Sequence, residues 1–395
     1  MANKAELKRY AKKIIMRIAL SPFRLFPVKK NRIVLYNNLG YKYSDNPKCV
    51  AEYLSKEYPG KFEIIFPMTD MSMSEELKKR GITVVRNKSP AYFYYAVTCH
   101  VFLTNSGGFS FLPMRKKQYV INTWHGGGAY KKCGIDMYED TPLFRKDLRL
   151  SADMTNVFLS TCRRFSDALH SSMLIPLDTF WEIGMPRNDA MLRKDPAVRE
   201  KIREKLGLAE DERFVLFAPT YRKPEDNYFN DSVAISYGID CDRVCAALEK
   251  RFGGHWRFAF RLHPLVVNRE SLPGKNVMDL SDYPDMQDLL CAADAMINDF
   301  SSSMWDFMLT GRPSFLFAMD LDHYVATTEV YTPVDEWPFP KSVNNDELEE
   351  NILTFDEEKY AADCKRHYDV LGGCESGCAT QKVCRRIYDV CYPDD

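Results

Sequence analysis

The sequence of 395 residues predicts an α/β protein with two doubly wound, mainly parallel sheets, preceded by a basic helix. Short apolar runs alternate with longer mixed segments, which is typical of strands alternating with helices. The runs are continuously apolar, as in strands that are buried on both faces. The alternation occurs in two successive series of about equal size, and the chain is too long for one ordinary core. We therefore expect two domains.

The boundary between the two series is expected near 188–212, in a polar and helix-favouring stretch. The predicted organisation is a basic segment over 1–30, a Rossmann-like domain over 31–195 and a second Rossmann-like domain over 196–395. We expect the two domains to face each other across a central cleft. The pattern leaves open whether the last helix crosses back to the first domain.

The expected strands are rich in β-branched and aromatic residues. In the first series they are 33–36, 62–66, 83–85, 101–103, 119–122, 157–160 and 180–183, with helices such as 47–58 and 74–80 between them. In the second series they are 214–217, 257–260, 276–278, 295–297 and 313–317, with helices such as 241–251 and 286–293.

The N-terminal segment is strongly basic. Residues 1–32 contain ten Lys or Arg and one acid, which leaves −10 for the rest of a chain whose net charge is −1. A helix over 4–20 would gather Leu7, Tyr10, Ala11, Ile14, Ile15 and Ile18 in one stripe, with Lys8, Arg9, Lys12, Lys13 and Arg17 opposite. Such a helix is typical of an anchor on an anionic membrane surface. The alternative is a helix packed on the protein body with a solvated basic face.

Other sequence features exclude several classes of protein. No apolar stretch approaches the roughly 20 residues of a membrane span, and no signal peptide is visible. The twelve Cys lack zinc-like pairing, which favours reduced thiols in a cytosolic protein. Asp299 and Asp306 could hold an ion, but an Asp at a strand end more often bonds neighbouring amides. We expect no metal and no cofactor.

A first candidate site follows the predicted strand 119–122. The chain there runs into Thr-Trp-His and a triple glycine, which places His125 beyond the carboxyl end of a strand. Ligands bind at this position in open α/β sheets. Gly126, Gly127 and Gly128 would let backbone amides approach an anion, and Lys131 follows three residues later. The alternative is a glycine turn with a structural histidine.

A second candidate site gathers polar residues from three strand ends of the second series. Thr220 and Arg222 follow 214–217, and His263 follows 257–260. Asp299 and the run Ser301, Ser302 and Ser303 follow 295–297, where serines can cap a helix and bind a phosphate. Each of these motifs alone is weak evidence for a site, but three polar strand ends in one domain indicate a binding site.

At this point the sequence resembles the CDP-glycerol glycerophosphotransferases, which make teichoic-acid and related capsular polymers. The segments that carry the resemblance occur in family order over roughly residues 30–385. They are Asn122-Thr-Trp-His-Gly, Ile183-Gly-Met-Pro-Arg-Asn-Asp, Phe217-Ala-Pro-Thr-Tyr-Arg, Arg261-Leu-His-Pro, Asn298-Asp-Phe-Ser-Ser, Arg312-Pro and Asp320-Leu-Asp-His-Tyr. The resemblance implies a GT-B fold and peripheral attachment to the cytoplasmic face of the membrane. It also implies phosphodiester formation between a CDP-polyol donor and a lipid-linked or polymeric acceptor.

The resemblance also assigns roles to residues of this chain. It implies two catalytic histidines, His125 and His263, and a donor site made by Thr220, Arg222, Arg261, Asp299, Ser301, Ser302 and Ser303. Arg187 and Asn188 join Gly126, Gly127 and Lys131 as further residues of the cleft. Family members often read Trp-His-Gly-Thr-Pro, whereas Gly127-Gly128 stand here, so the resemblance leaves the identity of the polyol open.

As a mechanism, an acceptor hydroxyl would attack the β-phosphorus and expel CMP, with His125 as the candidate general base. The reverse assignment of the two histidines stays open. One alternative is a GT-B glycosyltransferase that uses a nucleotide-sugar. A non-catalytic protein that binds nucleic acid or a membrane partner through its basic N-terminus is disfavoured, because polar residues cluster at the strand ends and the chain offers no extended basic groove beyond residues 1–32.

Overall fold

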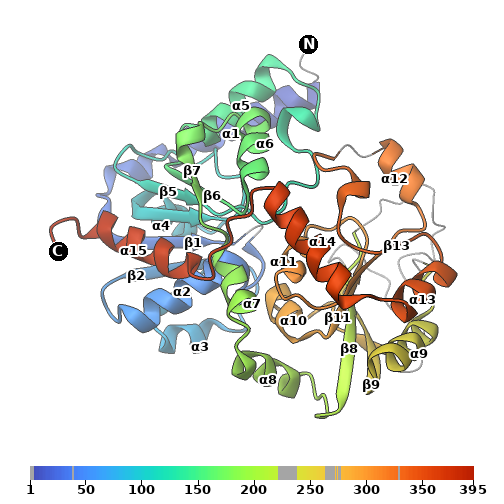
Figure 1. The fold of residues 1–395 in the computed structure, drawn as a ribbon. Coiled ribbons are helices and arrows are strands. Elements are labelled where there is room, and N and C mark those ends of the chain that lie inside the picture. Colours follow the sequence, from blue (N-terminus) through green and yellow to red (C-terminus); the bar gives the residue numbers. More distant parts are fainter. Residues whose placement is uncertain are drawn as a thin grey trace. The chain divides into compact units, whose positions relative to one another are not determined.

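The computed structural model describes residues 4–37, 40–220, 238–262, 272, 274, 277–327 and 330–395 (Figure 1). It confirms the predicted α/β class with two parallel sheets. The chain forms two compact units, which we call unit 1 (Met1–Asp189 with Gly372–Asp395) and unit 2 (Ala190–Leu371). Two predicted site residues, Arg222 and His263, lie outside the described residues.

Unit 1 contains a seven-stranded sheet in the order β3-β2-β1-β4-β5-β6-β7, with parallel pairing throughout. Its strands are β1 (Lys29–Tyr36), β2 (Glu63–Met68), β3 (Ile82–Arg86), β4 (Cys99–Thr104), β5 (Tyr119–Asn122), β6 (Val157–Ser160) and β7 (Phe180–Glu182). The main helices are α1 (Lys4–Leu20), α2 (Asp45–Glu57), α3 (Ser74–Lys79), α4 (Pro90–Thr98), α5 (Pro142–Ala152), α6 (Arg163–Met173) and α15 (Ala379–Cys391). Short 3-10 turns include η1 (Ser21–Leu25), η3 (Gly134–Asp136), η4 (Leu177–Thr179) and η5 (Pro186–Asn188).

Alternate residues of the central strand β1 enter two different cores. Ile33 and Leu35 pack with α2, α3 and α15 on one face of the sheet. Val34 packs with α4 and the end of α1 on the other face. Since successive side chains of a strand point to opposite faces, a continuously apolar strand implies helices on both sides. Figure 1 shows these layers in unit 1.

The segment Gly372–Asp395 returns to unit 1, where α15 packs on the first core. Its helix N-terminus is held by Asp189, whose two carboxylate oxygens accept the backbone N–H groups of Ala379 (2.9 Å) and Thr380 (2.7 Å). Asp189 is buried, so these charge-assisted bonds satisfy amides that have no partner within the helix.

Unit 2 contains a six-stranded parallel sheet in the order β10-β9-β8-β11-β12-β13. The strands are β8 (Glu212–Phe217), β9 (His255–Phe260), β10 (Val277–Asp279), β11 (Ala295–Asn298), β12 (Ser314–Phe317) and β13 (Lys341–Ser342). The helices are α7 (Asp189–Arg193, at the junction with unit 1), α8 (Pro196–Lys205), α9 (Cys241–Phe252), α10 (Met286–Ala292), α11 (Ser303–Met308), α12 (Leu321–Thr327), α13 (Asn345–Leu353) and α14 (Glu357–Val370), with the 3-10 turn η7 (Val334–Glu336).

The predicted strands 119–122 and 157–160 are confirmed residue for residue as β5 and β6. Most other predicted strands gain one to four residues at an end, whereas 62–66, 180–183 and 313–317 each lose one end residue. The edge strand β13 was not predicted, because two residues carry no periodic pattern.

Helix α1 confirms the predicted helix, but Lys13 and Arg17 do not lie on a solvated basic face, as the alternative to a membrane anchor supposed. The Nζ atom of Lys13 donates to the Asp147 carboxylate at 2.6 Å, and Nη1 of Arg17 donates to the carbonyls of Ser110 and Leu112, both at 2.8 Å. Both cations therefore attach α1 to the rest of unit 1, because buried carbonyls and a carboxylate there need donors.

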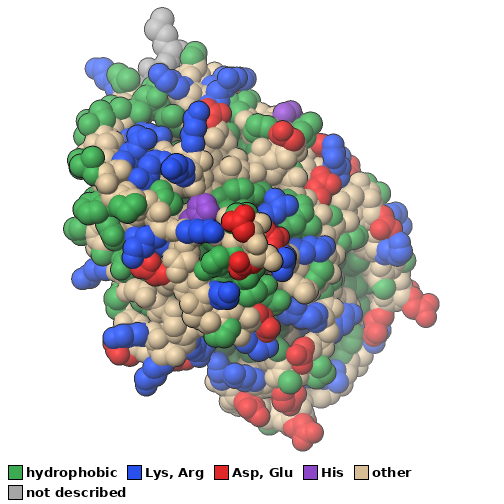
Figure 2. Space-filling model, turned by 90° about the vertical axis from the view of Figure 1, so that its left-hand side faces the viewer, with side chains coloured by type: hydrophobic (Ala, Val, Ile, Leu, Met, Phe, Trp, Pro, Cys, Tyr) green, Lys and Arg blue, Asp and Glu red, His purple; other side chains and the backbone are tan. Residues whose placement is uncertain are grey.

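With Lys13 and Arg17 turned inward, part of the apolar stripe of α1 faces solvent. Leu7, Ile15 and Ile18 are 58%, 64% and 67% exposed, and Leu25 in the following turn is 89% exposed. On the face of the molecule drawn in Figure 2, hydrophobic side chains gather at the upper left, and Lys and Arg side chains lie between them. None of the described helices is long and apolar enough to cross a membrane.

Candidate active site

The order of each sheet reverses direction at one pair of strands, β1 with β4 in unit 1 and β8 with β11 in unit 2. Ligands of doubly wound proteins bind outside the carboxyl ends of the strands at such a position. In unit 1 a side-chain hydrogen bond joins the ends of these two strands. Nδ2 of Asn105, which follows β4, donates to Oδ1 of Asn37, which follows β1, at 2.8 Å. In unit 2, Thr220 bonds Asp299 in the corresponding position.

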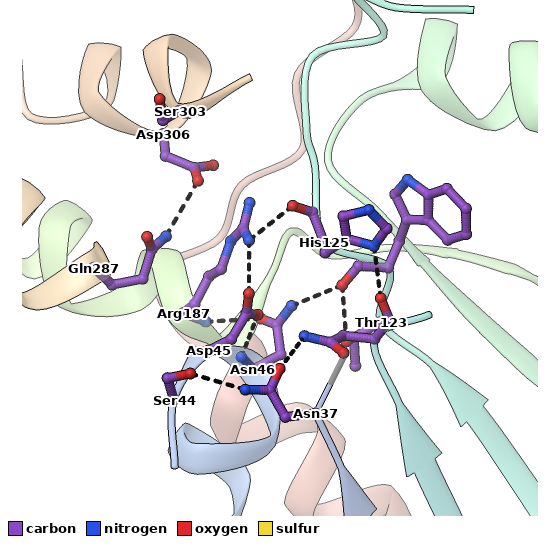
Figure 3. Close-up of polar contacts among 12 residues, drawn as sticks. Asn37, Ser44, Asp45, Asn46, Thr123, His125, Arg187, Gln287, Ser303 and Asp306 are labelled. Atoms are coloured by element: carbon purple, nitrogen blue, oxygen red, sulfur yellow. Dashed lines mark hydrogen bonds and ion pairs between the residues drawn. The ribbon is translucent and has the colours of Figure 1, made fainter. Parts of the chain in front are cut away.

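His125 lies at this edge of unit 1, three residues after β5 ends (Figure 3). Its ring Nδ1 is 2.8 Å from the backbone carbonyl of Asn105. A carbonyl only accepts hydrogen bonds, so the neutral imidazole carries its proton on Nδ1 and its lone pair on Nε2. The Trp124 ring contacts the imidazole in a tilted arrangement, with 4.7 Å between centroids and 30° between planes. The arrangement fixes the tautomer that a general base needs.

The electrostatic surroundings of His125 lower the pKa of its imidazole. Its side chain is exposed at the surface, yet surrounding protein atoms desolvate the ring and bring the pKa below its ordinary value. The Asn105 carbonyl and the Asp45 carboxylate oppose this effect, and the Arg187 guanidinium adds to it. Desolvation is the largest of these influences, so His125 is poised to accept a proton near neutral pH.

Two further segments hold the backbone around His125. Nη1 of Arg187 donates to the His125 carbonyl and to the Asp45 carboxylate, both at 3.0 Å. Nδ2 of Asn46 donates to the Trp124 carbonyl at 3.2 Å, and its Oδ1 accepts the backbone N–H of Arg187 at 3.0 Å. These bonds link three segments around the imidazole, as Figure 3 shows. The segments are the start of α2, the turn that follows β5, and the 3-10 turn η5.

The other predicted residues of unit 1 divide into two groups. Arg187 lies beside His125, whereas Nδ2 of Asn188 donates to the Glu375 carboxylate at 2.7 Å and so helps to hold the C-terminal segment. Gly126 and Gly127 directly follow His125, and the N–H of Gly128 donates to Oγ1 of Thr161 at 3.2 Å. Lys131 is exposed beyond this turn.

In unit 2, Asp299 fixes the end of β8. Its carboxylate accepts the backbone N–H of Thr220 (2.9 Å), the Thr220 hydroxyl (2.8 Å) and the backbone N–H of Phe300 (2.6 Å). The Asp299 carboxylate therefore organises two neighbouring strand ends. Among the residues that the structure describes, no group of three or more His, Cys, Asp and Glu could hold a metal ion.

The serine run of unit 2 forms a hydrogen-bonded series at the start of α11. Nδ2 of Asn298 donates to Oγ of Ser303 at 2.7 Å, and Oγ of Ser303 lies 3.0 Å from Oγ of Ser301. Ser302 occupies the N-cap position, and its side chain makes no capping hydrogen bond. The three serines are partly exposed, so their hydroxyls lie at the surface of this sheet edge.

Arg261, which is predicted to belong to the donor site, bonds two backbone carbonyls. Its Nη1 donates to the carbonyls of Leu280 (3.3 Å) and Tyr283 (2.7 Å), which ties the end of β9 to the segment after β10. Burial lowers the pKa of Arg261, against the opposing effect of nearby carboxylates led by Asp285. Through these contacts Arg261 holds the segment after β10 against the end of β9.

Sequence reasoning missed four polar residues around His125, namely Asn37, Asp45, Asn46 and Asn105. Asn37 and Asn105 each follow a predicted strand closely, which was a usable signal for the same sheet edge. The Asp-Asn-Pro run that contains Asp45 and Asn46 precedes a predicted helix and resembles an ordinary N-cap. No local sequence pattern distinguishes an ordinary N-cap from residues that hold the segment around His125.

The fold and the polar strand ends define the class: two doubly wound parallel sheets with candidate ligand residues at their carboxyl edges, the GT-B architecture. A family model described as CDP-Glycerol:Poly(glycerophosphate) glycerophosphotransferase matches residues 18–389, and the chain belongs to this family of transferases. The family that the motifs predicted is thereby confirmed.

Individual relatives agree with this assignment. The chain is 25% identical over 396 residues to a teichoic acid glycerol-phosphate transferase of Staphylococcus aureus, covering 97% of this chain and 100% of the relative. It is 29% identical to a teichoic acid poly(glycerol phosphate) polymerase of Staphylococcus epidermidis, covering 75% of this chain but only 41% of that protein's length. A solved structure of the wall teichoic acid polymerase TagF has the same fold, with a TM-score of 0.81, 24% identity and 98% of each chain covered.

Proposed function

We propose that this chain transfers glycerol-phosphate from CDP-glycerol to a hydroxyl of a teichoic-acid-type acceptor and releases CMP. The observation that carries the proposal is the family match together with His125, held in its Nδ1–H tautomer at the ligand-binding edge of unit 1. The acceptor is a lipid-linked or polymeric polyol phosphate, in keeping with the relatives named above.

In the proposed reaction, an acceptor hydroxyl attacks the β-phosphorus of CDP-glycerol. A new P–O bond forms, the bond from that phosphorus to the bridging oxygen breaks, and CMP leaves with the electron pair. The hydroxyl proton passes to Nε2 of His125. Charge develops on the phosphoryl oxygens, so fixed donors at the serine run of unit 2 would stabilise the transition state.

The test of this function is a comparison of donors. Purified protein and a synthetic lipid-linked glycerol-phosphate acceptor are incubated with CDP-glycerol, CDP-ribitol or a UDP-sugar. Release of CMP or UDP is quantified, and the product is examined by mass spectrometry. We expect CMP release with a product enlarged by glycerol-phosphate. Release of UDP alone would instead identify a sugar transferase.

The chain's proposed location is the cytoplasmic face of the membrane, with α1 lying on an anionic surface. Leu7, Ile15, Ile18 and Leu25 would enter the headgroup boundary, since these apolar side chains are exposed in the structure. The exposed Lys8, Arg9 and Lys12 would contact anionic lipids, each contributing about 1 kcal/mol.

We expect the double substitution Ile15→Glu with Ile18→Glu to reduce co-sedimentation with anionic liposomes at least tenfold. Each change removes an apolar contact worth about 1.5–3 kcal/mol at full burial and adds a negative charge. Val370→Glu is the matched control, because Val370 is 69% exposed on α14 of unit 2. Equal liposome binding by the double variant and the wild type would refute this orientation of α1.

A further inference from the structure

We propose that Asp45 is a positioning residue for His125, acting through Arg187 and through its own negative charge. This inference rests on the proposed role of His125 as general base and adds a residue that sequence reasoning did not single out. Its first support is geometric. A single guanidinium nitrogen of Arg187 joins the Asp45 carboxylate to the His125 carbonyl, with both contacts at 3.0 Å.

The second support is the backbone of Asp45. Its φ of +64° lies in the left-handed region, although it is the first residue of α2. A non-glycine residue is uncommon there and is retained where surrounding contacts fix it. The carboxylate contributes to this conformation, because it accepts the backbone N–H of Asn46 while its second oxygen accepts from Arg187.

The third support is that neighbouring contacts hold both peptide groups that flank His125. Asn46 holds the Trp124 carbonyl on one side of His125, and Arg187 holds the His125 carbonyl on the other. Trp124 itself has a φ of +54°, so the turn that presents the imidazole is a strained one. Loss of the Asp45 carboxylate would remove one of the contacts that position Arg187 and so weaken its hold on this turn.

Charge gives Asp45 a second effect that a merely structural residue would lack. Among the residues that the structure describes, two charged groups act on the imidazole in opposite directions, Asp45 from α2 and Arg187 from η5. Removing the carboxylate should lower the His125 pKa further, and removing the guanidinium should raise it. The substitutions Asp45→Asn and Arg187→Gln therefore move the acid limb of a pH profile in opposite directions.

The experiment uses Asp45→Asn and Asp45→Gly, because Asn and Gly both tolerate a positive φ and should preserve the fold. Asp45→Glu keeps the negative charge but lengthens the side chain. It therefore separates the effect of the charge from the effect of the position of the carboxylate. Asp167→Asn, in an exposed pair with Arg163 on α6, is the matched control. Thermal unfolding checks that each variant is folded.

Two readouts are measured on each full-length variant. The first is the His125 pKa from NMR titration of labelled histidines, with the His125 signal assigned by its absence in His125→Gln. The second is the pH dependence of kcat/KM for CMP release. We expect Asp45→Asn and Asp45→Gly to lower the pKa and to reduce kcat/KM about 10- to 100-fold. We expect Asp45→Glu to retain the pKa with reduced kcat/KM, and Asp167→Asn to change neither.

An unchanged His125 pKa together with wild-type kcat/KM in folded Asp45→Asn and Asp45→Gly would overturn the inference. The NMR titration does not depend on turnover, so it tests Asp45 even if CDP-glycerol proves not to be a substrate. Conversely, an active wild type with unaffected Asp45 variants would remove the role of Asp45 and leave the proposed function intact.

Discussion

The substitution His125→Ala is expected to lower kcat for CMP release about 10²- to 10⁴-fold, because a positioned general base typically contributes that factor. The imidazole is held in one tautomer by the Asn105 carbonyl at 2.8 Å, so its Nε2 lone pair is directed for proton transfer. Since the base must be neutral to act, its lowered pKa predicts that kcat/KM stays high as the pH falls to about 6.5, the ordinary histidine value.

The control for this prediction is His100→Ala. His100 is the second residue of β4 in the same sheet, and its Nδ1 is 3.0 Å from the Lys30 carbonyl, so its local bonding matches that of His125. It lies at the amino end of its strand, where doubly wound sheets do not bind ligands. Steady-state CMP release near the wild-type rate in His125→Ala would remove the general-base role.

The largest expected loss of stability comes from Asp189→Ala. Both oxygens of this buried carboxylate accept backbone N–H groups at the start of α15, and their loss leaves two buried donors without an acceptor. We expect the free energy of unfolding of unit 1 to fall by about 3 kcal/mol, since hydrogen bonds to charged groups contribute about 1.5–3 kcal/mol. Urea unfolding and hydrogen exchange of the 379–391 amides measure the effect.

Asp195→Ala is the matched comparison. Asp195 also caps a helix, accepting the N–H of Ala197 at 3.0 Å, but it is exposed, so water can replace the lost bond. We expect a loss of about 1 kcal/mol there. If Asp189→Ala left the exchange of α15 unchanged, the carboxylate would not be what holds this helix.

The central strands were predictable from the sequence because burial on both faces leaves a continuous apolar run. Strand β1 illustrates this, with Ile33 and Leu35 in one core and Val34 in the other. His125 was predictable for a related reason, since a polar residue just past such a run lies at the ligand edge of the sheet. The two-residue strand β13 carries no such pattern.

The residues around His125 were harder to predict, because their contacts are long-range. Asp45 and Arg187 are 142 positions apart, and no periodicity relates them. The inward direction of Lys13 and Arg17 was missed for a different reason. Their cationic groups suggested solvent, whereas the structure uses them to satisfy a carboxylate and two carbonyls. Charge alone did not indicate which side of α1 faces the protein.

The return of residues 372–395 to unit 1 bears on how the chain acquires its fold during synthesis. Helix α15, with Ile387 and Cys391 among its buried residues, completes a core whose other buried members all come before residue 190. All of unit 2 therefore leaves the ribosome before unit 1 can close its hydrophobic surface. Until α15 arrives, that surface stays accessible to chaperones, and the inserted unit has time to fold first.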